Sequence, residues 1–187
     1  MTGSTVISNN ILVQVMVVAA AWIMLFKFNL VMFTFSEIIP TVNLVFLPAM
    51  LRVVAVLVCG WAGAFGLGLG VILCMGPEDL TRSSLEIFTD VLINIVGPYV
   101  GVAVGKRIMK VPESLDGLTS NHIIMFSILG GVSNALFHQP LHLMMPTRPS
   151  FFDATITMFV GDMIGCAIML YTMSFVLRMV AHFRKTV

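Results

Sequence analysis

The stretch FVGDMIGCAIML, from Phe159 to Leu170, places one acidic residue in the middle of a long apolar segment. Apart from Asp162, the residues from Ala154 to Leu177 carry no charge. A charged side chain at the centre of a bilayer costs at least about 2.5–3.5 kcal/mol on insertion scales. We therefore expect Asp162 to face the interior of a helical bundle, where an opposite charge meets it.

The composition of the whole chain is that of an integral membrane protein. Hydrophobic residues make up 58% of the 187 residues and charged residues only 10%, whereas soluble domains carry about 25% charged residues. The formal net charge of +1 and the absence of a long basic run argue against a nucleic-acid partner. We expect a single all-α transmembrane bundle, residues 1–187, with the lipid bilayer as its surroundings.

Apolar segments predict about six membrane spans, because a bilayer core of about 30 Å needs roughly 20 helical residues. The 32 residues from Leu44 to Met75 are too long for one crossing, and Gly60 offers a break between two short helices. One tilted helix or a re-entrant pair is the alternative there, and five spans are the alternative to six. The expected spans cover residues 11–33, 42–59, 61–75, 84–104, 120–137 and 151–178.

Basic residues predict the orientation of these spans. Lys and Arg gather in GKRIMKVPESLDG (Gly105–Gly117) and in the C-terminal RMVAHFRKTV (Arg178–Val187). Cytoplasmic loops carry an excess of Lys and Arg, so both segments belong on the cytoplasmic side of a bacterial inner membrane. Six spans place the N-terminus there as well, whereas five spans place it outside.

Glycines spaced four residues apart predict faces on which helices approach closely. Such glycines line one side of a helix and let another backbone come near. We expect them to pack within one bundle, and a homodimer face is the alternative. The glycines concerned are Gly66, Gly70, Gly97, Gly101, Gly105, Gly161 and Gly165.

Polar residues at membrane depth predict a site around Arg52 and Asp162. Both lie roughly 12–17 Å from the outer surface, and each would relieve the burial cost of the other. Asp90 and Asn94 are four residues apart and share a helix face, and Asn134 lies at a similar depth. The pair either fixes the packing register or forms a ligand or proton site. An anion would use Arg52, whereas a cation would use Asp90 or Asp162.

The stretch FHQPLHLMMP (Phe137–Pro146) contributes His138 and His142. Their spacing suits a metal on a helix, but Pro140 lies between them and no third ligand is adjacent. We expect histidines of an interfacial loop, with a lid over the cavity or a pH response as alternatives. We expect no metal and no cofactor. No catalytic motif is present either, so we expect a protein that is not an enzyme.

Three stretches resemble, in order, the MASE1 family of membrane-associated sensor domains. They are NLVFLPAMLRVVAVLVCGWAGAFGLGLGVIL (Asn43–Leu73), LTSNHIIMFSILGGVSNALF (Leu118–Phe137) and FVGDMIGCAIML, whose Gly161, Asp162 and Gly165 match the family's Gly-Asp-x-x-Gly core. The resemblance implies an input module that senses a signal and passes it to a cytoplasmic kinase or cyclic-dinucleotide domain. Because the chain stops at Val187 without such a domain, we expect a partner protein to carry the output.

A second resemblance is to the substrate-binding subunits of energy-coupling-factor vitamin transporters. These proteins are six-helix bundles of about this length, with a Gly-small turn that Gly60 matches. The resemblance implies docking onto a coupling subunit through a glycine face such as Gly97, Gly101 and Gly105. The leading hypothesis is a sensory or ligand-binding membrane module. The alternatives are a transporter component and a structural subunit of a membrane assembly.

Overall fold

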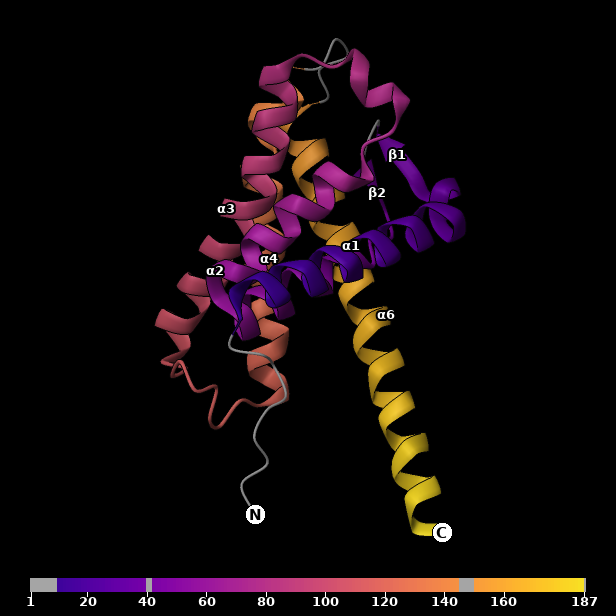
Figure 1. Ribbon diagram of the computed structural model, residues 1–187, viewed down its shortest axis with the longest axis vertical. Helices are drawn as coiled ribbons and strands as arrows, with labels where there is room; N and C mark the ends of the chain where they lie inside the picture. The colour runs from indigo at the N-terminus through magenta and orange to yellow at the C-terminus, as the bar shows by residue number, and fades with distance from the viewer. Residues whose placement is uncertain (1–9, 40–41, 145–149, 187) are drawn as a thin grey trace.

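The computed structural model describes residues 10–39, 42–144 and 150–186, whose regular elements are helices apart from one short two-stranded ribbon (Figure 1). The helices are α1 (Ile11–Phe33), α2 (Pro48–Cys74), α3 (Ser84–Met109), α4 (Ser120–Phe137), α5 (Gln139–Met144) and α6 (Phe151–Thr186). The 3-10 helices are η1 (Thr34–Ser36) and η2 (Pro77–Thr81), and the antiparallel strands are β1 (Glu37–Ile39) and β2 (Val42–Asn43). The all-α class is therefore correct, and the ribbon is an addition to it.

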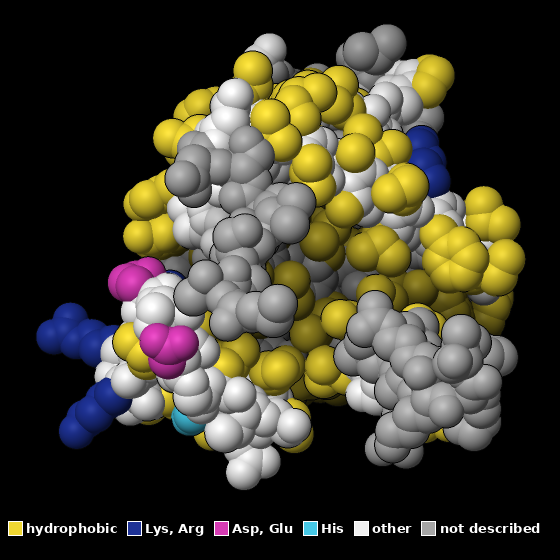
Figure 2. Space-filling model, turned by 60° about the horizontal axis from the view of Figure 1, so that its bottom comes forward, with side chains coloured by type: hydrophobic (Ala, Val, Ile, Leu, Met, Phe, Trp, Pro, Cys, Tyr) yellow, Lys and Arg dark blue, Asp and Glu magenta, His cyan; other side chains and the backbone are white. Residues whose placement is uncertain are grey.

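Four helical segments are long and apolar enough to cross a membrane by length and composition. The segments are Ile11–Ser36, Pro48–Cys74, Ser84–Met109 and Phe151–Val176. Many of their apolar side chains are exposed, and Figure 2 shows hydrophobic side chains over a large part of one face. On α1, for example, Met24 and Val31 are 69% and 77% exposed. A surface of this kind suits lipid rather than water.

Helix α2 differs from the two spans expected over residues 42–59 and 61–75. Residues 42–43 belong to strand β2, and the helix begins only at Pro48. It bends at Gly60, whose φ of 55° and ψ of −128° only glycine adopts readily. The bend is sharp, because a Cβ added to Gly63 would lie 2.0 Å from the carbonyl oxygen of Ala55. The arms 48–59 and 61–74 each measure roughly 20 Å, so neither arm alone crosses a 30 Å hydrocarbon core.

Local side-chain caps set where the other helices begin and end. At the start of α3, Ser83 Oγ accepts a hydrogen bond from the Glu86 amide, and the Glu86 carboxylate accepts one from the Ser83 amide. This capping box satisfies donors that a helix start leaves free. Helix α3 ends at Met109, and the C-cap residue Lys110 has a φ of 53°. It is therefore five residues longer than the expected span 84–104.

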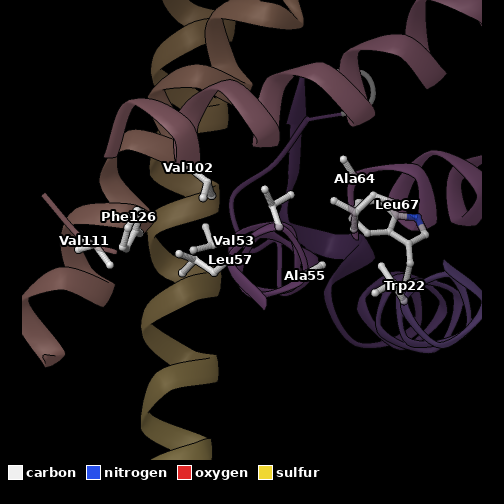
Figure 3. Packing of buried hydrophobic residues seen from close by; sticks show 11 residues of the cluster. Trp22, Val53, Ala55, Leu57, Ala64, Leu67, Val102, Val111 and Phe126 are labelled. Atoms are coloured by element: carbon white, nitrogen blue, oxygen red, sulfur yellow. The ribbon is translucent and has the colours of Figure 1, made fainter. Parts of the chain in front are cut away.

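The helices pack in two groups that both contact α2. Helix α1 lies along the second arm of α2 and runs across the direction of α6 (Figure 1). Helices α3, α4 and α6 lie on the other side. Trp22, Val53, Leu67, Val102 and Phe126 belong to one buried cluster that connects the two groups (Figure 3).

Each of the seven glycines expected at helix contacts lies against another segment of this chain. Gly66 and Gly70 meet α1, Gly97, Gly101 and Gly105 meet α4, and Gly161 and Gly165 meet the backbone of Asn43 and Phe46. The chain itself thus fills the faces that a homodimer or a coupling subunit would have used.

Candidate functional site

A cavity of about 670 Å³ lies where α1, the ribbon, α2, α3, α4 and α6 converge. Its volume falls within the range of small-molecule pockets, roughly 300–1,000 Å³. One part of its wall is apolar, with Trp22, Phe26, Val42, Phe46, Leu141 and Met158. The remainder, called the polar wall below, carries charged and amide side chains, and Arg52 lies against the aromatic rings of Trp22 and Phe46.

The guanidinium of Arg52 is the centre of the polar wall. Its Nη1 lies 3.5 Å from Asp162 Oδ1, and its Nη2 donates a 3.1 Å hydrogen bond to Asn94 Oδ1. Its Cζ lies 5.2 Å from the ring centroid of Trp22 and 4.8 Å from that of Phe46. Arg52 is 7% exposed and Asp162 is 4% exposed. The first arm of α2 and the middle of α6 thus bring together the two charges that the sequence predicts to meet.

Hydrogen bonds extend from Asp162 deeper into the bundle. Asn134 Nδ2 donates to Asp162 Oδ2 over 2.8 Å, so its Oδ1 is left as the free acceptor of that amide. The backbone carbonyl of Asn134 lies 2.9 Å from His138 Nδ1. All three side chains are more than nine-tenths buried. The side chains of the polar wall therefore form a buried hydrogen-bond network.

A second ion-pair cluster lies at the rim of the cavity. Arg82 Nη1 lies 3.0 Å from Asp90 Oδ2 and 3.1 Å from Asp79 Oδ1. Asp90 Oδ1 also accepts a 3.1 Å hydrogen bond from Asn94 Nδ2, which joins this cluster to Arg52. Partial burial acts to lower the pKa of Arg82, but hydrogen bonds to Asp79 and Asp90 outweigh it and raise that pKa above its usual value. Arg82 remains a cation that holds η2 against α3.

Several buried polar atoms on the polar wall have no hydrogen-bond partner among the described residues. They are Arg52 Nε, Arg52 Nη1, Trp22 Nε1 and Asn134 Oδ1. Arg52 Nη1 is within ion-pair distance of Asp162 but does not donate a hydrogen bond to it. Leaving such groups unpaired costs about 1–3 kcal/mol each. The neighbouring side chains enclose these atoms almost completely.

The expected site residues Arg52, Asp90, Asn94, Asn134 and Asp162 all line the cavity. The two histidines differ from the expected interfacial loop, because His142 lies in α5 and its amide donates to the His138 carbonyl over 3.2 Å.

Both histidine rings are buried. His138 forms part of the cavity wall, whereas His142 does not line the cavity. Burial lowers the pKa of His142, which disfavours the protonated ring. Pro140 is compatible with this geometry because it occupies the first turn of α5, where no intrahelical donor is needed.

The sequence reasoning missed the aromatic residues Trp22 and Phe46 and the rim residues Asp79 and Arg82. The sequence gives a weak indication for Trp22. Trp22 and Phe26 are four residues apart, so the two aromatic side chains share one face of the first span. Arg82 had a clearer one, because it stands eight residues before Asp90 at the start of a span. Arg82 is the one basic residue among four nearby acids, Glu78, Asp79, Glu86 and Asp90, which favours an ion pair with one or more of them.

The arrangement suits binding more than covalent chemistry. Within residues 10–39, 42–144 and 150–186, no group of three or more His, Cys, Asp or Glu residues could hold a metal ion. The cavity combines aromatic side chains with buried and half-buried ion pairs. These are the features of a site that holds and orients a small molecule.

Comparison with protein-family models, with curated proteins and with solved structures finds no match for this chain.

Proposed function

We propose that this chain is a sensory module of the bacterial inner membrane that binds a small molecule in the cavity beside Arg52 and Asp162. The observation that carries the proposal is a buried, hydrogen-bonded arginine on the wall of a cavity of about 670 Å³. The resemblance of Gly161, Asp162 and Gly165 to the MASE1 core adds support, because it assigns the same part of the chain to an input function.

The proposed topology places the basic segments in the cytoplasm and opens the cavity toward the periplasm. In Figure 1 the loop after α3 and the C-terminus lie toward one end, and η2 lies toward the opposite end. Opposite locations for the basic segments and the rim of the cavity suit the positive-inside rule. Helix α4 and the two arms of α2 then complete the six membrane segments expected from the sequence.

Helix α6 provides the proposed connection from the cavity to a partner. It carries Asp162 at the cavity and continues to Thr186, roughly 36 Å further along its axis at 1.5 Å per residue. Beyond Leu170 its described side chains are exposed, including Tyr171 and Phe175. Ligand contact at Arg52 and Asp162 would bias the packing of α6, and a cytoplasmic or membrane signalling protein would read the change.

The alternatives fit the geometry less well. A transporter subunit that docks through Gly97, Gly101 and Gly105 needs that face free, and α4 covers it. A purely structural subunit has no use for a cavity of ligand size, because interiors are normally packed with few voids larger than a water molecule. The sensory proposal uses both the cavity and the long helix.

Native mass spectrometry of the purified full chain in detergent tests this function. We expect a retained small molecule on the wild type and a co-purifying kinase or cyclase. The variant Met158→Trp should lose the retained mass, because Met158 lines the cavity. The matched variant Ile156→Trp should keep it, because Ile156 is 59% exposed on the same helix. A wild type that retains no small molecule, before or after incubation with a metabolite extract, would exclude the proposal.

A further inference from the structure

The Lys, Arg, Asp and Glu side chains that line the cavity carry more negative than positive charge. Five of them are carboxylates and three are basic groups, so their formal sum is −2. The carboxylates belong to Glu37, Asp79, Glu86, Asp90 and Asp162, and the basic groups to Lys27, Arg52 and Arg82. A cavity lined by an excess of one charge favours a ligand of the opposite charge.

Two pairs of opposite charge account for half of these residues. Arg52 and Asp162 are both buried and lie 3.5 Å apart. Lys27 and Glu37 are both exposed, so water and salt screen them, and their charges sum to zero. The excess negative charge therefore belongs to the four remaining residues. We call them the rim cluster: Asp79, Arg82, Glu86 and Asp90.

The rim cluster contains one guanidinium and three carboxylates. Asp79 Oδ1 and Asp90 Oδ2 lie 3.1 Å and 3.0 Å from the same nitrogen, Arg82 Nη1. Glu86 and Asp90 are four residues apart on α3, so their side chains share one face of that helix. The side chains of Asp79, Arg82 and Asp90 are 24%, 25% and 18% exposed. A cation that reaches them keeps part of its hydration, which limits the cost of its burial.

Apolar side chains lie beside the rim cluster on the cavity wall. Val71 and Met75 are half-buried lining residues in the last turn of α2 and just after it, and Asp79 follows four residues after Met75. The half-buried ring of Phe26 lines the cavity from α1 and meets the Phe46 ring edge-on, with centroids 6.5 Å apart. Such side chains pack against an apolar ring or chain. A ligand that uses both features joins a positive group to an apolar body.

An organic cation suits the rim cluster better than a metal ion. In the part of the chain that the structure describes, no group of three or more His, Cys, Asp or Glu residues could hold a metal. Asp79 accepts hydrogen bonds from Gly76 and Arg82, and Asp90 accepts from Arg82 and Asn94. A carboxylate offers about four lone-pair sites, so each still has room for an N–H donor.

Resting on the proposed function, we propose that the ligand is a small organic cation, with an ammonium or guanidinium group attached to an apolar ring or chain. The positive group donates to the carboxylates of the rim cluster, and the apolar body packs against Phe26, Val71 and Met75. Asn94 donates to Asp90 and accepts from Arg52, so it joins the rim cluster to the buried pair. A bound cation therefore acts on α6 through this amide.

Three probes with the same phenylethyl group and different head groups test the ligand class. Phenethylamine is a cation, phenylpropanamide is uncharged and phenylpropanoate is an anion. Each is titrated at neutral pH against the purified full chain in a nonionic detergent, with thermal unfolding as the readout. We expect phenethylamine to raise the melting temperature and to bind about tenfold more tightly than phenylpropanamide, with phenylpropanoate the weakest. Equal or tighter binding of either other probe, or no stabilisation by phenethylamine, overturns the ligand class.

The variant Glu86→Gln tests the rim cluster directly. It removes one negative charge, and glutamine at this position still completes the capping box with Ser83. We expect it to weaken binding of phenethylamine about threefold and to leave binding of phenylpropanamide unchanged. Glu113→Gln is the matched control, because Glu113 pairs with Lys106 outside the cavity. Equal effects of the two variants on phenethylamine overturn the role of the rim cluster.

Native mass spectra of the wild type separate this assignment from the proposed function. A retained organic cation supports both. A retained molecule that is uncharged or anionic refutes the ligand class and leaves the binding function in place. Retention of no small molecule refutes the proposed function itself.

Discussion

Two glycine seams of this chain have the same spacing in the sequence and different partners in the fold. On α6, a Cβ added to Gly161 or Gly165 would lie 2.1 Å or 2.0 Å from a backbone carbonyl oxygen. On α3, the corresponding Cβ at Gly97 or Gly105 would meet side chains, at 3.5 Å and 2.7 Å. The α6 seam, Gly161 and Gly165, holds an irregular chain segment, whereas the α3 seam, Gly97, Gly101 and Gly105, holds another helix.

The α6 seam therefore lies beside the proposed binding site, whereas the α3 seam lies in the scaffold. The carbonyl of Gly161 accepts a 3.2 Å hydrogen bond from the amide of Phe46, whose ring lies against Arg52. Asp162 follows directly on the same helix. Close approach at the α6 seam thus places an aromatic ring and a carboxylate beside one guanidinium.

The largest effect should come from separating the charges that the α6 seam brings together. Arg52→Gln leaves Asp162 as a buried charge without its partner, which costs about 3–5 kcal/mol of stability. We expect this loss in the free energy of unfolding measured in detergent micelles. Asp162→Asn should cost a similar amount, because it leaves the guanidinium uncompensated.

The double variant Arg52→Gln with Asp162→Asn separates pairing from simple burial. If the two residues interact, it should be less destabilised than the sum of the single variants. Asp153→Asn is a control that removes an exposed acid from the first turn of α6 and should change stability little. If the stability losses of the two single variants simply add in the double variant, Arg52 and Asp162 have no interaction free energy despite their short distance.

The meeting of Arg52 with Asp162 could be predicted from the sequence because the membrane makes an isolated charge costly. The residues 11–33 and 120–137 also coincide with α1 and α4, since their apolar lengths and the cap at Thr119 mark the ends. In both cases the free-energy cost of exposing a charge or an unpaired backbone group to the bilayer leaves few alternative structures.

The parts that could not be predicted depend on contacts between distant segments. A glycine spacing does not indicate whether the partner is a helix or a carbonyl, so the two seams were indistinguishable. The ribbon of β1 and β2 is too short to leave an alternation pattern, and its place is set by the amide of Leu44 donating to Ser36. The sharpness of the bend at Gly60 depends on Gly63 meeting Ala55.

The next largest effect should come from adding a methyl group at the α6 seam. Gly165→Ala would place Cβ 2.0 Å from the carbonyl oxygen of Phe46, so the segment before α2 must move. We expect a loss of about 3 kcal/mol, at the upper end for overpacking, because backbone cannot change rotamer to give way. Thermal unfolding in detergent measures the loss.

Gly165→Ala should also disturb the site itself. Movement of Phe46 removes one of the two rings beside the Arg52 guanidinium. Retention of a small molecule in native mass spectra should therefore weaken in whatever fraction of the variant remains folded. A variant that keeps wild-type stability and wild-type binding would contradict the distinction between the seams.

The smallest effect should come from the same substitution at the α3 seam, in the variant Gly97→Ala. An added Cβ would lie 3.5 Å from Phe137 Cβ, which is ordinary van der Waals contact. Replacing a helical glycine by alanine stabilises a helix by roughly 0.5–1 kcal/mol where space allows. We therefore expect Gly97→Ala to unfold at the wild-type temperature or slightly above it. Since both substitutions add one methyl group to a glycine seam, opposite signs at Gly97 and Gly165 would identify the partner of each seam as the cause. Equal losses of stability in the two variants would show instead that the cost of the added methyl group does not depend on the partner of the seam.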